Sequence, residues 1–121
     1  MSFPTSDDEL LLLHNSRCSK CRASKALLEE RGVAFSERFY LDEPLSKEEL
    51  EELATRLGKP ATEWVRRKED AFAVAGLTDD SNADAILDAM AAHPILVERP
   101  ILVRGQRAVI GRPPEDILDL L

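Results

Sequence analysis

A run of four leucines near the start of the chain constrains the fold more than any other feature. Residues 10–13 are all leucine. A continuous apolar run of this length is too short for a helix and fits a strand that is covered on both faces. A short polar loop and a segment with helical periodicity follow it. The chain is therefore predicted to begin with a strand that leads directly into a helix, which ends near Gly32.

The remaining elements occur in an order that defines a fold class. Aromatic residues in the segment 33–41 predict a second strand. Residues 101–103 and 108–110 flank a turn at Gly105 and predict a β-hairpin, which a last helix follows. The order βαβ, helices, ββα predicts an α/β fold, with a small mixed sheet and flanking helices. This is the thioredoxin and glutaredoxin architecture.

The middle of the chain is predicted to be helical. A capping box at Ser46 begins an amphipathic helix, Thr62 is predicted to cap a short helix, and Asn82 is predicted to cap a longer one. The sequence contains no repeat and no linker-like stretch. We therefore predict a single thioredoxin-like domain over residues 1–121, with a helical insert at about 46–94.

Composition excludes several classes of protein. The chain has 121 residues, 44% of them hydrophobic and 32% charged, with a formal net charge of −7. An acidic chain is a poor candidate for binding phosphate backbones through its overall charge. No apolar run approaches the ~20 residues of a membrane span, and the acidic residues 7–9 argue against a secretory signal. We expect a cytoplasmic monomer that binds neither nucleic acid directly nor a membrane.

Two cysteines form a C-x-x-C pair where the first loop becomes the first helix. In a reducing compartment such a pair is more often catalytic, redox-sensing or metal-binding than structural. A helix N-terminus and basic neighbours lower the pKa of a thiol, so Cys18 is predicted to be a reactive thiolate rather than a small buried apolar residue. Cys21 lies one helical turn further on. It either resolves an oxidised or adducted Cys18, or it is an ordinary buried helix residue.

A metal centre is the weaker interpretation of the same residues. His14, Cys18, Cys21 and His93 are the possible zinc ligands, but structural zinc sites use ligand pairs at short spacing and His93 stands alone. We therefore predict no metal site. His14, at the end of the first strand, is predicted to tune the thiol or to hold the loop through hydrogen bonds.

Several arginines lie at junctions between the predicted elements. Arg99 and Arg112 each precede a proline, and residues 66–68 are all basic. The guanidinium group matches a tetrahedral oxyanion, so arginines that converge on a thiolate would form an oxyanion pocket. The alternative, that each arginine is a solvated charge paired with an acidic residue, stays open at this point.

Four motifs carry a family resemblance that covers nearly the whole chain. They are residues 14–22 (HNSRCSKCR), Arg67 with Lys68, residues 93–101 (HPILVERPI) and residues 110–115 (IGRPPE). Together they resemble the glutaredoxin-coupled arsenate reductase (ArsC) family, in its short YfgD-like subgroup. The resemblance implies a thioredoxin-like core with an inserted helical region.

The resemblance also implies roles for individual residues. Cys18 corresponds to the nucleophile that attacks arsenate and forms a thiol–arsenate adduct. His14 corresponds to a histidine that favours the thiolate of this nucleophile. Arg67, Arg99 and Arg112 correspond to three arginines that bind the oxyanion.

The resemblance also implies that turnover uses external thiols and no bound cofactor. Glutathione attacks the adduct as a co-substrate, and glutaredoxin then removes the glutathione so that arsenite is released. The family commonly has serine where this chain has Cys21, so an internal disulfide with Cys18 is a second way to resolve the adduct. The resemblance further implies a cis peptide bond between Arg99 and Pro100.

Two other functions share this fold and the paired cysteines. One is an Spx-like redox-sensing transcriptional regulator that binds RNA polymerase. The other is a general thiol oxidoreductase, which would need no set of three arginines. The arginines and His14 favour the arsenate enzyme over both.

Overall fold

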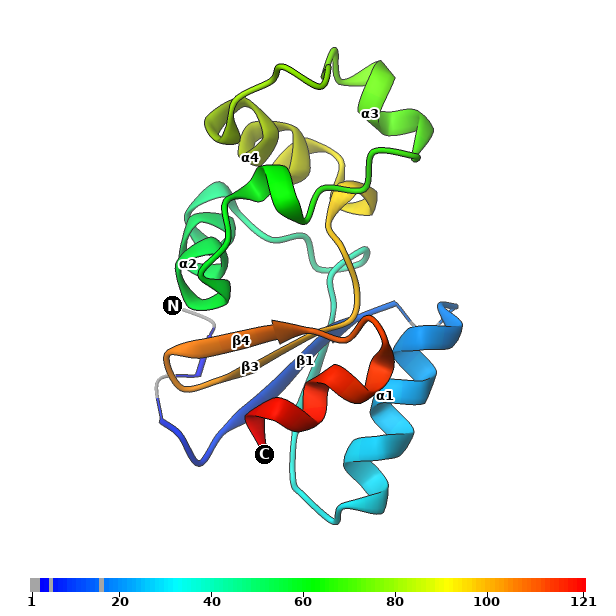
Figure 1. Ribbon diagram of the computed structural model, residues 1–121, viewed down its shortest axis with the longest axis vertical. Helices are drawn as coiled ribbons and strands as arrows, with labels where there is room; N and C mark the ends of the chain where they lie inside the picture. Colours follow the sequence, from blue (N-terminus) through cyan, green and yellow to red (C-terminus); the bar gives the residue numbers. More distant parts are fainter. Residues whose placement is uncertain (1–2, 5, 16) are drawn as a thin grey trace. The chain divides into compact units, whose positions relative to one another are not determined.

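A four-stranded sheet with the strand order β2-β1-β3-β4 positions the residues of interest. Figure 1 labels three of its strands, β1, β3 and β4. β1 and β2 are parallel, whereas β3 is antiparallel to both β1 and β4. The mixed sheet of a thioredoxin-like fold is therefore confirmed. The strands are β1 (Leu10–His14), β2 (Ser36–Phe39), β3 (Ile101–Arg104) and β4 (Arg107–Ile110).

The chain divides into two compact units in this computed structural model, which describes residues 3–4, 6–15 and 17–121. The first unit comprises Met1–Glu43 and Arg99–Leu121 and contains the sheet; the second comprises Pro44–Glu98. Ser16, which belongs to the first of the four motifs, lies outside the described residues. The second unit corresponds to the helical insert expected at about 46–94, and the organisation as a single domain stays a prediction.

The leucine run forms the centre of the sheet. All four of its side chains are buried. Because successive side chains of a strand point to opposite faces, Leu10 and Leu12 share one face, where they pack with residues of α1 (Ser19–Glu30), β3 and η3 (Pro114–Leu120). Each fully buried leucine contributes about 1.5–3 kcal/mol. The other buried members of this cluster are Leu28, Leu102, Ile117 and Leu120.

The second unit is helical, and two of its predicted caps are confirmed. The Ser46 hydroxyl accepts a hydrogen bond from the Glu49 N–H (3.1 Å), and the Glu49 carboxylate accepts one from the Ser46 N–H (3.0 Å). The Asn82 side chain accepts a bond from the Ala85 N–H (2.9 Å). The elements are α2 (Lys47–Leu57), η1 (Ala61–Glu63), α3 (Asp70–Val74), α4 (Ala83–Ala92) and η2 (Pro94–Leu96).

Other local predictions differ from the structure. Thr62 lies inside η1, which begins after Pro60, so the prediction that it caps a helix is wrong. β2 is shorter than the predicted segment 33–41, because β1 offers pairing partners along only a few residues. The last helix is a 3₁₀ helix. Among the described residues, no helix is both long and apolar enough to cross a membrane.

The register of the sheet brings distant residues to one edge. The carboxyl ends of the parallel strands β1 and β2 lie at the same edge, where β3 also begins and β4 ends. Cys18 follows β1, Tyr40 follows β2, Arg99 precedes β3 and Arg112 follows β4. Four segments that are far apart in the sequence therefore meet beside the start of α1.

Because Gly111 has no side chain, its backbone can pack closely against Pro100, Ile117 and Ser24 at this edge of the sheet. A Cβ atom there would lie 2.8 Å from Pro100 Cγ, 2.9 Å from Ile117 Cγ2 and 2.9 Å from Ser24 Oγ. The Gly111 N–H also donates to the Pro100 carbonyl (2.8 Å). We expect Gly111→Ala to lower the free energy of unfolding by about 1–3 kcal/mol, because the crowded neighbours must move. Urea unfolding measures this, and an unchanged midpoint and slope would contradict it.

Candidate active site

Cys18 occupies the N-cap position of α1, as the sequence predicts. Its N–H donates to the Asn15 carbonyl (2.9 Å), and its carbonyl accepts the first bond of the helix from the Arg22 N–H (3.0 Å). The first N–H groups of a helix have no partner within the helix and lie at the positive end of its dipole. The Cys18 sulfur therefore lies where a negative charge is stabilised.

The pKa of Cys18 is lowered. Burial opposes ionisation, but the N–H and the thiol of Cys21, the N–H of Lys20 and the charge of Arg99 together outweigh it. The half-buried Cys18 thiol therefore ionises more readily than a free cysteine.

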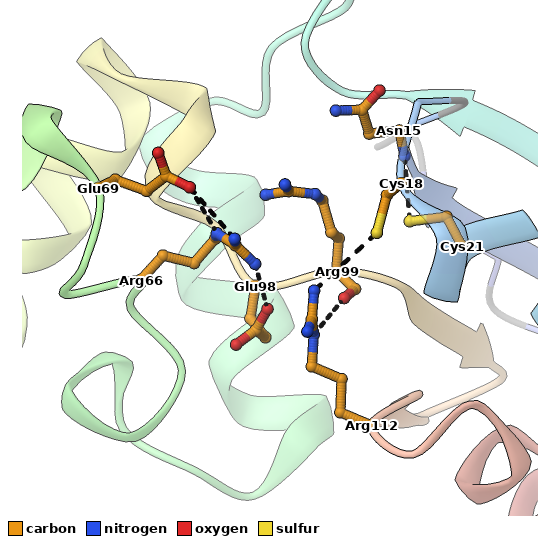
Figure 2. Close-up of polar contacts among 8 residues, drawn as sticks. All are labelled: Asn15, Cys18, Cys21, Arg66, Glu69, Glu98, Arg99 and Arg112. Atoms are coloured by element: carbon orange, nitrogen blue, oxygen red, sulfur yellow. Dashed lines mark hydrogen bonds and ion pairs between the residues drawn. The ribbon is translucent and has the colours of Figure 1, made fainter.

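Cys21 has the opposite character. It is completely buried, and its Sγ accepts a hydrogen bond from the Asn15 N–H at 3.4 Å (Figure 2). Burial, assisted by the neighbouring Cys18, raises the pKa of Cys21 to about 12. Both cysteines are free, and their sulfur atoms lie side by side. The pair thus combines a thiolate with a neutral thiol that donates to it.

The two thiols are expected to differ strongly in reactivity. Alkylation by iodoacetamide requires the thiolate, so its rate rises with pH through the pKa of each thiol. Because the pKa of Cys18 is lowered, its alkylation rate rises at a lower pH than that of a free cysteine. Because the pKa of Cys21 is raised, its alkylation rate rises only far above neutral pH. At neutral pH we expect Cys18 to react at least about a hundredfold faster, as measured by mass spectrometry of the two modified peptides. Equal rates would contradict this difference.

Arg99 and Arg112 both lie beside Cys18. Arg112 Nε donates to the Arg99 carbonyl oxygen (2.7 Å), and Arg112 Nη2 is 4.0 Å from Cys18 Sγ (Figure 2). Burial opposes the charge on Arg99, but hydrogen bonds and charge interactions with Tyr40 and Cys18 outweigh burial and raise its pKa. The structure therefore brings together two of the three arginines that the sequence singles out. Cis peptide bonds follow both arginines, and the resemblance implies only the one before Pro100.

Arg67 makes its contacts within the second unit. Its Nη2 donates to the Thr62 carbonyl (2.9 Å), and its Nη1 is 3.5 Å from Asp79 Oδ1. The guanidinium carbon also lies 5.6 Å from the centre of the Phe72 ring. A part for Arg67 in oxyanion binding stays a prediction.

The neighbouring Arg66 is held more firmly than Arg67. Its Nη1 lies 2.8 Å from Glu98 Oε1 and its Nη2 lies 3.1 Å from Glu69 Oε1 (Figure 2). Its N–H donates to the Leu96 carbonyl (2.8 Å), beside the bridge between Val65 and Val97. The sequence of residues 66–68 does not indicate which of its two arginines is held between two carboxylates.

His14, the last residue of β1, is buried beside β2. Its Nε2 lies 3.0 Å from Glu37 Oε1, which also contacts Lys25 Nζ (3.1 Å), and its ring centre is 4.6 Å from that of Phe39. Burial lowers the pKa of His14 by more than Glu37 raises it. The imidazole is therefore neutral at pH 7. An effect of His14 on the Cys18 thiolate stays a prediction.

A cavity of about 430 Å³ lies at the other edge of the sheet, where β1 and β2 begin. Leu10, Leu11, Ala34 and Phe35 contribute to its lining, and the lining contains none of the predicted site residues. Among the described residues, no group of three or more His, Cys, Asp and Glu side chains could hold a metal ion.

Tyr40, which contacts Arg99, is the part of the site that the sequence motifs did not identify as functional.

Comparison with known proteins identifies the family. The family model described as "ArsC family" matches residues 13–120. The chain is 42% identical over 111 residues to an arsenate reductase of Neisseria meningitidis, covering 90% of this chain and 95% of that protein. It is 40% identical over 115 residues to the protein YfgD of Escherichia coli, covering 93% and 97% of the two chains.

A solved structure extends this similarity to the fold. The arsenate reductase from Vibrio cholerae superposes with a TM-score of 0.88 at 40% identity, and the match covers 93% of this chain and 98% of that one. The family model spans both compact units and includes Cys18, Cys21, Arg99 and Arg112. The protein therefore belongs to the ArsC family.

Proposed function

We propose that this protein reduces arsenate to arsenite, with the Cys18 thiolate as nucleophile. The observation that carries the proposal is the position of its sulfur, at a helix N-terminus and beside the guanidinium groups of Arg99 and Arg112. A site of this kind suits a thiolate that attacks a tetrahedral oxyanion. The arsenate reductases among its relatives support arsenate as that oxyanion.

In the proposed first step, Cys18 Sγ attacks arsenic(V) and forms a sulfur–arsenic bond. One arsenate hydroxyl takes up a proton from solvent and leaves as water. Arg99 and Arg112 offset the charge of the oxyanion and the charge that develops on the departing oxygen, which is the usual contribution of preplaced cations. Arg67 is proposed as the third oxyanion ligand, and His14 as a residue that favours the thiolate.

In the proposed second step, the glutathione thiol attacks the arsenic of the adduct and displaces a second oxygen as water. A glutaredoxin thiolate then attacks the glutathione sulfur, the bond between that sulfur and arsenic breaks, and its electron pair stays on arsenic. Water finally cleaves the bond between Cys18 Sγ and arsenic(III), which releases arsenite and the Cys18 thiol. The overall reaction converts arsenate and two thiols into arsenite, one disulfide and water. Formation of the sulfur–sulfur bond supplies the two electrons that reduce arsenic(V) to arsenic(III). The scheme requires no bound cofactor.

Cys21 offers an alternative second step. Its sulfur would attack Cys18 Sγ, the sulfur–arsenic bond would break, and arsenite would leave with the electron pair. The resulting Cys18–Cys21 disulfide would need an external dithiol to reduce it. The adjacent sulfur atoms favour this route, but a pKa of about 12 leaves little Cys21 thiolate at neutral pH. The glutathione route is therefore the one proposed first.

The experiment is arsenate-dependent oxidation of NADPH in two reducing systems. One contains glutathione, glutaredoxin and glutathione reductase, and the other contains thioredoxin and its reductase without glutathione. We expect turnover in the first system. Turnover only in the second would replace the glutathione step with the Cys21 step, and no arsenate dependence in either would overturn the proposal. In that last case, co-purification with RNA polymerase would favour the regulator, and reduction of disulfide substrates the general oxidoreductase.

A further inference from the structure

Tyr40 lies at the sheet edge that carries Cys18. His14, the last residue of β1, pairs with Phe39, the last residue of the parallel strand β2. The residue that follows Phe39 therefore emerges beside the loop that leads to Cys18. Tyr40 is completely buried there, and it is the only tyrosine in the sequence.

A buried phenol hydroxyl needs a hydrogen-bond partner. For Tyr40 that partner is the guanidinium group of Arg99, whose positive charge also interacts with the Cys18 thiol. The backbone of Arg99 is held separately, because its carbonyl oxygen accepts the 2.7 Å bond from Arg112 Nε. Tyr40 and Arg112 thus fix the side chain and the main chain of the same arginine.

We propose that Tyr40 is a positioning residue that directs Arg99 at Cys18. Its hydroxyl accepts a hydrogen bond from the guanidinium group and holds that group against the sulfur. A free arginine side chain would lose much rotamer freedom on meeting an anion, and an arginine that is already fixed avoids this loss. The fixed guanidinium stabilises the Cys18 thiolate. In the arsenate reaction, and resting on the proposed function, it also stabilises the bound oxyanion.

The first test is Tyr40→Phe, which keeps the ring and removes the hydroxyl. We expect the pH profile of Cys18 alkylation to move to higher pH and the rate at neutral pH to fall about threefold. The matched control is Ser24→Ala, which removes another completely buried hydroxyl from the same unit. Ser24→Ala is expected to leave the pH profile of Cys18 alkylation unchanged. In the arsenate assay, Tyr40→Phe is expected to raise KM more than it lowers kcat.

A double substitution tests whether Tyr40 acts through Arg99. With Arg99→Ala already present, Tyr40→Phe is expected to add no further shift to the alkylation profile. An equal shift in both backgrounds would overturn the proposal, as would a Tyr40→Phe profile that matches the unmodified protein. Alkylation does not use arsenate, so the outcome for Tyr40 can be measured even if the protein does not reduce arsenate.

A third measurement keeps the Tyr40 hydroxyl and changes its partner instead. Because the chain has one tyrosine, incorporation of 3-fluorotyrosine gives a single ¹⁹F resonance from Tyr40. We expect this resonance to move in Arg99→Lys and to stay in place in Arg107→Lys, which alters an exposed arginine of β4. A resonance that does not respond to Arg99→Lys would overturn the proposal, even if Tyr40→Phe fails to fold.

Discussion

Cys18→Ser is expected to lower arsenate-dependent turnover by about 10⁴-fold or more. The helix N-terminus and Arg99 stabilise an anion at this position, but they cannot ionise an alcohol at neutral pH. The replacement changes one atom of a half-buried side chain outside the apolar core, so the fold is expected to persist. The rate of NADPH oxidation in the glutathione system measures the loss.

Cys21→Ser is the matched variant, since it makes the same atom change one helical turn away. Its hydroxyl can still donate a hydrogen bond to the Cys18 thiolate, so most of the turnover is expected to remain in the glutathione system. Near-normal activity of Cys18→Ser would rule out Cys18 as the nucleophile. Loss of activity in Cys21→Ser would instead assign the second step to Cys21.

Arg112→Ala is expected to lower kcat/KM for arsenate by about 10²–10³-fold. The change removes a cation whose Nη2 is 4.0 Å from Cys18 Sγ, and it also removes the 2.7 Å bond that holds the carbonyl of Arg99. Two contributions to anion binding are therefore weakened together. Steady-state kinetics measure the effect, and slower alkylation of Cys18 at neutral pH gives a second readout that does not depend on arsenate.

Arg107→Ala provides the control for Arg112→Ala, because Arg107 is an exposed arginine of the neighbouring strand β4. It is expected to leave both measurements nearly unchanged. Arg112→Lys keeps the charge but loses the geometry of the guanidinium group, so its effect is expected to be intermediate. If Arg112→Ala behaved like Arg107→Ala, Arg112 would have no part in oxyanion binding.

Most of the fold could be predicted because its signals are local. The leucine run, the capping box at Ser46 and the turn at Gly105 each specify backbone conformation through neighbouring residues. One error arose where a partner decided the outcome, because the extent of β2 depends on its pairing with β1. The other is a shift of a boundary, because η1 begins one residue before Thr62 rather than after it.

The same distinction between local signals and contacts with distant segments applies to the candidate site. The sequence by itself determined that Cys18 lies at the start of a helix, because the strand, the loop and the helix are consecutive. Only the tertiary structure decided which groups surround its sulfur. Arg99 and Arg112 reach Cys18, and Tyr40 reaches Arg99, through the pairing and register of four strands, whereas Cys21 acquires its raised pKa by burial. Neither strand register nor burial is encoded in a short stretch of sequence, because both depend on contacts between distant segments.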